Sequence, residues 1–266
     1  MKRFLLSLLT LGLVVALVAF ALLPVAVRQI RLWQSARAVS GYQDAASRLS
    51  PQDCDRLLAR ARAHNQAQDG GDDYAALLNP AGDGTMAVLE APKLGIIQPV
   101  YHGDGSGDTG RVEHVVQSRL PCVGADGPCL LRATRERFFD PFAGLDRLMA
   151  GDCFFLRVLR ETWTYEVLQV SEETPEALAG TDPGDGDECV LIAAAPDSGG
   201  DARLVVRGRR VPRQSVNPTD DSRMLPGGAS ELILATPVAA AGLALLALIE
   251  GIRRAVQRHR RRHMKL

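Results

Sequence analysis

The chain has 266 residues, of which 46% are hydrophobic and 23% are charged, and these values fit one globular domain with additional segments. They exclude a collagen, a disordered chain and a small disulfide scaffold, and no two of the 5 cysteines have the CxxC spacing of a zinc or redox site. The net charge of zero conceals an asymmetry. All 31 acids lie between Asp44 and Glu250, and residues 28–250 hold only 22 of the 31 bases, so this part of the chain is acidic and the two ends are basic.

Near the N-terminus, residues 4–27 carry no charge, and this run is long enough for an apolar helix that crosses a bilayer, which takes about 20 residues. We therefore predict a cytoplasmic N-terminus at residues 1–3 and a transmembrane helix at 4–27. A cleaved signal peptide is the alternative, because Ala19-Phe20-Ala21 has the small-x-small form of a cleavage site. The hydrophobic run continues past that site, which favours an uncleaved anchor.

Residues 28–80 are rich in Ala, Arg, Leu and Gln, with apolar residues at helical intervals, and they predict an extracellular helical lead-in. Residues 81–215 change to short β-like runs separated by Gly/Asp turn clusters. The eight predicted strands are Met86–Leu89, Gly95–Val100, Val112–Val116, Leu130–Arg132, Phe154–Leu159, Thr162–Val170, Val190–Ala193 and Arg203–Val206. With one helical stretch near Phe142–Met149, this mainly β pattern favours a closed barrel over an α/β sheet.

The C-terminal part completes the predicted topology. A linker at residues 216–231 precedes a second apolar run, a predicted transmembrane helix at 232–249, and a basic tail at 250–266. The positive-inside rule places this tail in the cytoplasm, so both ends are expected there and the main domain outside a cell membrane crossed twice. A nucleic-acid patch is the alternative interpretation of the tail, but its position directly after an apolar run favours a membrane role, and we expect no nucleic-acid partner.

Several short motifs follow one another in the strand-rich region. They are Gly84-Thr85-Met86, Glu90-Ala91-Pro92-Lys93-Leu94, Pro99-Val100-Tyr101-His102-Gly103, Ser118-Arg119-Leu120-Pro121, Phe142-Ala143-Gly144-Leu145-Asp146, Gly151-Asp152, Ala195-Pro196 and Arg203-Leu204-Val205-Val206-Arg207-Gly208. Their order and spacing resemble those of the class C, pilin-polymerising sortases, and the two flanking membrane runs resemble that class too.

The resemblance implies an eight-stranded sortase-like β-barrel and a cysteine transpeptidase of a Gram-positive cell surface. In such enzymes a cysteine thiolate attacks the Thr–Gly carbonyl of an LPxTG-type sorting signal, a histidine protonates the leaving amine and an arginine stabilises the oxyanion. The implied partners are the membrane, sorting signals of pilins or wall proteins, and an active sortase. We expect no cofactor and no metal, because the sequence contains no phosphate-binding loop and no metal-ligand cluster.

Two of the three implied catalytic residues are missing. The nucleophile position, two residues before the Pro of the Ala195-Pro196 segment, is Ala194, and an alanine methyl cannot form a thioester. The histidine position falls on Ala133, or on Thr134 if one gap is allowed. Only the arginine, nine residues after the nucleophile position, is present, as Arg203, although a plain surface arginine on a basic strand is the alternative interpretation. Class C enzymes carry an Asp-Pro-aromatic lid motif ahead of the first strand, and this chain has no such motif there. The tripeptide Asp140-Pro141-Phe142 does occur, but it lies after the histidine position and is not interpreted as a lid.

Other side chains do not replace the missing catalytic cysteine and histidine. His64, His102 and His114 are interpreted as hydrogen-bonded structural histidines. Cys189 precedes Ala194 by five residues on one strand, about 16 Å away and on the opposite face because the offset is odd.

The remaining cysteines are not at catalytic positions. Cys122 and Cys129 bracket a short loop and either form a local disulfide or are free buried thiols. Cys54 and Cys153 are interpreted as small apolar core residues.

The leading hypothesis is a degenerate, catalytically inactive class C sortase-like membrane protein that acts as an accessory in pilus or LPxTG-protein assembly. A rival hypothesis is an active enzyme with a displaced nucleophile, either Thr134 or Ser198. A third is a structural membrane protein that retains only the barrel.

Overall fold

The computed structural model describes residues 2–66, 74–103, 110–121, 127–135, 140–174, 187–194 and 202–212. The chain divides into two compact units, one made of Met1–Ile30 with Met224–Leu266 and the other of Arg31–Arg223. Helix α1 (Lys2–Arg48) contains the predicted span 4–27, whereas the predicted linker, second span and basic tail lie outside the described residues. None of the helices in the described ranges is long and apolar enough to cross a membrane.

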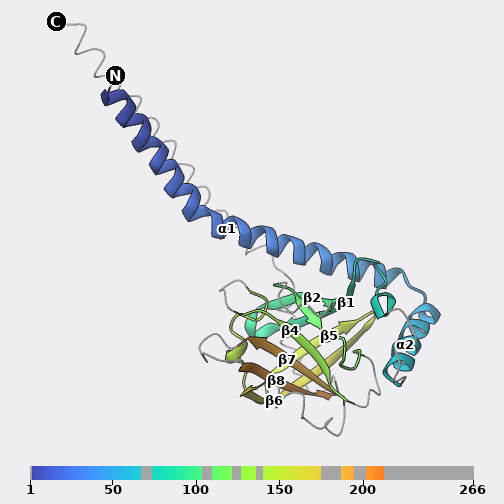
Figure 1. The fold of residues 1–266 in the computed structure, drawn as a ribbon. Helices are drawn as coiled ribbons and strands as arrows, with labels where there is room; N and C mark the ends of the chain where they lie inside the picture. Colours follow the sequence, from blue (N-terminus) through green and yellow to red (C-terminus); the bar gives the residue numbers. More distant parts are fainter. Residues whose placement is uncertain are drawn as a thin grey trace, which may run out of the picture. The chain divides into compact units, whose positions relative to one another are not determined.

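Eight strands of the second unit close into a barrel in the order β1-β2-β3-β4-β7-β8-β6-β5 (Figure 1). This confirms the predicted barrel, and every predicted strand overlaps an observed one. The strands are β1 (Thr85–Ala91), β2 (Ile96–His102), β3 (Val112–His114), β4 (Cys129–Ala133), β5 (Cys153–Val158), β6 (Glu161–Glu173), β7 (Glu188–Ala194) and β8 (Arg203–Val211). The pairs β2/β3 and β4/β7 are parallel, and the other pairs are antiparallel.

The part of α1 that belongs to the second unit is attached to the barrel by Tyr42. Its side chain is 1% exposed, and its hydroxyl donates to the carbonyl of Met86 at 2.7 Å and accepts from the amide of Leu159 at 2.8 Å. Burial raises the pKa of Tyr42, so the hydroxyl keeps the proton that it donates. One side chain thus connects the helix to β1 and to the turn after β5.

Helix α2 (Pro51–Gln66) begins at a side-chain cap. The hydroxyl of Ser50 accepts from the amide of Asp53 at 3.1 Å and donates to its carboxylate at 2.7 Å, which satisfies a free N–H of the first turn. The helix contributes Leu58 and Ala61 to the hydrophobic core. Together α1 and α2 agree with the predicted helical lead-in.

Between β4 and β5 the predicted helical stretch Phe142–Met149 is shorter than expected. Only the single 3₁₀ turn η3 (Leu145–Arg147) forms there, and two further 3₁₀ turns, η1 (Tyr74–Ala76) and η2 (Pro92–Leu94), lie elsewhere in the described chain. The reason is Gly144, whose φ of 79° is left-handed and interrupts a right-handed helical path after Phe142.

The barrel interior is closely packed where β8 pairs with β6. Phe154 and Tyr165 stack with ring centroids 5.3 Å apart, and a Cβ added to Gly208 would lie 2.5 Å from Cε1 of Phe154. We therefore expect Gly208→Ala to lower the free energy of unfolding by about 1–3 kcal/mol, because the rings must shift. Thermal or urea denaturation measures this. Gly41→Ala, which adds a methyl in a helix with nothing within 4 Å, is the control and should be neutral or stabilising.

Candidate functional site

The ends of three strands bring the predicted site positions together. In the parallel pair β4/β7, Ala133 lies opposite Ala193, and in the antiparallel pair β7/β8, Ala194 lies opposite Arg203. The last residues of β4 and β7 and the first residue of β8 are therefore neighbours at one edge of the barrel. From the spacing of neighbouring strands, the three predicted positions lie within about 10 Å of one another.

Strand alternation separates an inner from an outer row of residues at this edge. On β7, Leu191 and Ala193 belong to the hydrophobic core, and on β8, Leu204 and Val206 do so. Successive residues of a strand point to opposite faces, so Arg203 belongs to the outer row. The nucleophile position lies opposite this arginine in the register of β7 and β8.

The same alternation distinguishes the two candidates for the histidine position. Ala133 packs against the hydrophobic core and therefore belongs to the inner row. Thr134 is the next residue, half-buried, and its carbonyl accepts from the amide of Phe142 at 3.3 Å. Thr134 directly follows Ala133, the last residue of β4, which lies opposite Ala193 of β7. We infer that Thr134 fits the histidine position better than Ala133.

Arg203 lies opposite Glu173 of β6, but Glu173 is paired with another arginine. Its carboxylate accepts from Nη2 of Arg207 at 2.8 Å and from the hydroxyl of Ser171 at 2.7 Å. The hydrogen bond from Arg207 lowers the pKa of Glu173, which keeps the carboxylate ionised and engaged. Half-buried Arg203 has no hydrogen bond or ion pair within the described residues.

The described cysteines are poorly suited to act as nucleophiles. Cys189 is fully buried in the core, on the opposite face of β7 from position 194, as its odd offset predicts. A hydrogen bond with Cys189, together with burial, raises the pKa of the Cys129 thiol well above its usual value, and burial raises that of Cys54. Cys54 is buried and Cys153 is half-buried. Cys129 is a free buried thiol in this structure, and Cys122 lies outside the described residues, so the Cys122–Cys129 disulfide stays a prediction.

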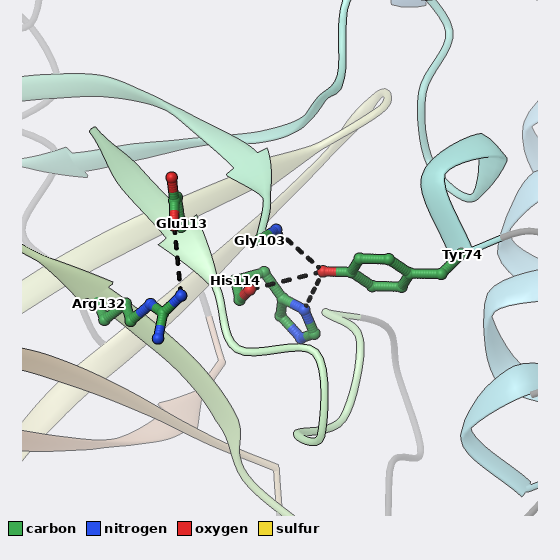
Figure 2. Close-up of polar contacts among 5 residues, drawn as sticks. All are labelled: Tyr74, Gly103, Glu113, His114 and Arg132. Carbon is green, nitrogen blue, oxygen red and sulfur yellow. Dashed lines mark hydrogen bonds and ion pairs between the residues drawn. The ribbon is translucent and has the colours of Figure 1, made fainter. Parts of the chain in front are cut away.

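The contacts of His114 confirm the prediction that it is a hydrogen-bonded structural histidine. It is 0% exposed, and its Nδ1 lies 2.8 Å from the hydroxyl of Tyr74 (Figure 2). Its Nε2 lies 2.9 Å from the carbonyl of Arg119. The Tyr74 hydroxyl also accepts from the amide of Gly103 at 3.3 Å. This network connects the segment before β1 to the loops after β2 and β3.

The other two histidines also lie away from the candidate site. The ring nitrogens of His102 lie 2.9 and 2.8 Å from the carbonyls of Gly84 and Leu77. His64 is on α2, with its ring centroid 6.2 Å from that of Tyr74.

The segment after the histidine position packs inward. Phe142 is 0% exposed and part of the core, and Asp140 lies 3.7 Å from Arg31 of α1. Asp140-Pro141-Phe142 is therefore a structural segment, in agreement with the interpretation that it is no lid. The alternative nucleophile Ser198 lies outside the described residues.

One ion pair near the site has no signature in the sequence. Arg132 of β4 lies opposite Glu113 of β3, and its Nη2 is 3.5 Å from the Glu113 carboxylate, which is 7% exposed (Figure 2). Arg132 precedes Ala133 and belongs to the outer row. No local signal identifies this pair, because it depends on which strands are neighbours.

The eight-stranded closed barrel, with Arg203 at the ends of β4 and β7, was compared with known proteins. Residues 89–211 match the family model described as the sortase domain. The comparison with curated proteins found no match.

Three solved structures illustrate the similarity. Sortase C1 from Streptococcus agalactiae is 28% identical over 66% of this chain and 99% of that chain, with a TM-score of 0.59. A lid mutant of sortase A from Corynebacterium diphtheriae is 25% identical over 65% of this chain and 100% of that chain, with a TM-score of 0.55. Sortase C from Streptococcus pneumoniae, 21% identical over 66% of this chain and 97% of that chain, shares the fold with a TM-score of 0.56. The chain is thus similar in structure to class C sortases.

Proposed function

We propose that this chain is a membrane-anchored sortase-family protein of a Gram-positive cell surface that binds LPxTG-type sorting signals without cleaving them. It acts as an inactive accessory in the assembly of pili or LPxTG proteins. The observation that carries the proposal is the outer row at the barrel edge, where an arginine is present and the neighbouring nucleophile position is an alanine.

The chemistry of the edge supports binding without reaction. Thioester formation needs a thiolate within reach of the peptide carbonyl, and the described cysteines of β4 and β7, Cys129 and Cys189, face the core at the opposite end of these strands. An arginine fork still donates hydrogen bonds to carbonyl oxygens. Arg207 holds Glu173, and Arg203 has no ion pair with any other residue that the structure describes, which supports such a contact.

The similar structures indicate the kind of partner. One is described as a pilus-related sortase C of Group B Streptococcus, and the description of the Streptococcus pneumoniae sortase C refers to its pilin substrate specificity. For this chain we extend that to the sorting signal of a pilin or wall protein, and to an active sortase that completes the transfer.

Two alternative functions can be distinguished from this proposal by experiment. Thr134 follows the end of β4 at the candidate edge, which supports an enzyme with a displaced threonine nucleophile. A purely structural barrel predicts no peptide binding at all.

The proposal is tested with purified full-length protein in detergent and an LPxTG peptide. Calorimetry should detect binding, a peptide with scrambled sequence should not bind, and intact-mass spectrometry should show no acyl adduct and no cleaved peptide. An adduct on Thr134, Ser198 or any cysteine would show an active enzyme. Absence of binding at millimolar peptide would favour the structural barrel.

The proposed topology, with residues 28–231 outside and both ends in the cytoplasm, has a separate test. Cysteines introduced at Gly105 and at His263 are treated in intact cells with a membrane-impermeant maleimide. We expect labelling at position 105 and none at position 263, because the basic tail stays inside. The reverse pattern would overturn the topology.

A further inference from the structure

Two cysteines lie side by side inside the barrel. Cys129 begins β4 and lies opposite Cys189 of β7 in the register of the parallel pair. Both belong to the hydrophobic core, and they are 4% and 0% exposed. Strand alternation therefore directs both side chains to the same, inner face.

The spacing of this pair suits a covalent bond. Partners on neighbouring strands have Cα atoms about 5 Å apart, and disulfides form at Cα separations of about 4.4–6.8 Å. The two thiols are within hydrogen-bonding reach, since a hydrogen bond with Cys189 is the main cause of the raised pKa of Cys129.

We propose that Cys129 and Cys189 are oxidised to a disulfide that links β4 to β7. The two thiols react by exchange with an external disulfide compound, R–S–S–R. One sulfur–sulfur bond forms in the protein, the external one breaks, and both protons leave on two R–SH molecules. The two electrons pass from the protein thiols to the external disulfide.

Burial determines when the exchange takes place. The native pair is buried out of reach of an external reagent, and the hydrogen bond with Cys189 and burial raise the pKa of the Cys129 thiol, so the reaction belongs to folding, before β4 and β7 close. An external disulfide as oxidant is available outside the cytoplasm, and in this respect the inference rests on the proposed function. The chemistry itself is testable without it.

The linkage acts directly on the candidate site. The end of β4 leads to Thr134, and the end of β7 carries position 194. A covalent bond at the other end of the same strand pair fixes their register, which a one-residue slip would otherwise change. The disulfide thus maintains the outer row.

The test refolds the denatured, full-length protein with a glutathione redox pair or with a reducing agent. Free thiols are then blocked with N-ethylmaleimide in denaturant, and a non-reducing digest is analysed by mass spectrometry. We expect a linked Cys129–Cys189 peptide in the oxidised sample, and a melting temperature higher by roughly 5 °C or more than in the reduced sample.

Two variants and two outcomes make the test decisive. Cys54→Ala should keep the linked peptide, and Cys189→Ala should lose it together with the difference in melting temperature. A Cys122–Cys129 peptide, or alkylation of both Cys129 and Cys189 after oxidative refolding, would overturn the proposal. The wild-type digest decides the matter even if the Cys189 variant does not fold. The result does not depend on peptide binding, so failure here and failure of the proposed function are distinguishable.

Discussion

The double variant Ala194→Cys with Thr134→His should form a thioacyl adduct when it is incubated with an LPxTG peptide. The thiolate at position 194 would attack the threonine carbonyl carbon, and the carbon–nitrogen bond to glycine would break. The imidazole at position 134 would protonate the leaving amine. Arg203 is already opposite position 194 and would stabilise the oxyanion. Intact-mass spectrometry measures the expected adduct, which the wild-type protein should lack.

The matched control places the same thiol elsewhere in the outer row. Ile192 lies two residues before Ala194 on β7, about 7 Å further from the edge. Ile192→Cys with Thr134→His should therefore give no adduct. If the cysteine at position 194 reacts with an alkylating reagent but not with the peptide, the edge does not have the geometry of a sortase site.

The strands could be predicted from the sequence because alternation is a local signal, but their ends could not. The prediction for β8 stopped at Val206, because the arginines that follow interrupt the apolar pattern, whereas the strand continues to Val211. Arg207 pairs with Glu173, and Arg210 lies 3.0 Å from Asp187. Such cross-strand ion pairs stabilise a polar strand end, and they depend on neighbours that are remote in sequence.

At the candidate site, too, some positions could be predicted from the sequence and others could not. Ala194 and Arg203 follow from a fixed offset along the chain, and the pairing of β7 with β8 puts them opposite each other. The two candidates for the histidine position, Ala133 and Thr134, are one residue apart, and a shift of one residue reverses the face of a strand. Because one gap in the match to the family is possible, the sequence alone did not decide between them. The alternation of buried residues at the end of β4 favours Thr134.

The cysteine pair required the most long-range information. The odd offset on β7 predicts that Cys189 faces away from position 194, and in the structure Cys189 belongs to the core. Its proximity to Cys129 depends on the parallel pairing of β4 with β7, which no local pattern encodes. Sequence spacing instead suggested Cys122 as the partner of Cys129.

Arg203→Ala should weaken peptide binding with little effect on stability. The guanidinium is half-buried at the edge, and it lacks an ionic partner in the part of the chain that the structure describes. Truncation therefore breaks no described ion pair of the folded state. In a partly dry groove, hydrogen bonds from this arginine to peptide carbonyls contribute on the order of 1–3 kcal/mol.

That contribution corresponds to an affinity reduced roughly 5- to 150-fold, which titration calorimetry resolves readily. Arg209→Ala is the matched control, because Arg209 lies on the same strand and is exposed. It removes the same charge from β8, so any loss of affinity that it shares with Arg203→Ala comes from the general electrostatic field. The specific contact is the difference between the two variants.

The melting temperatures of both variants should stay close to that of the wild-type protein. A large fall for Arg203→Ala would indicate a structural role in place of a contact with peptide. Equal binding by the wild-type protein and the variant would mean that the arginine does not contact the peptide, and the purely structural barrel would then be the better account of this domain. A specific loss of affinity, with stability retained, would establish that this edge of the barrel binds peptide although position 194 carries no thiol.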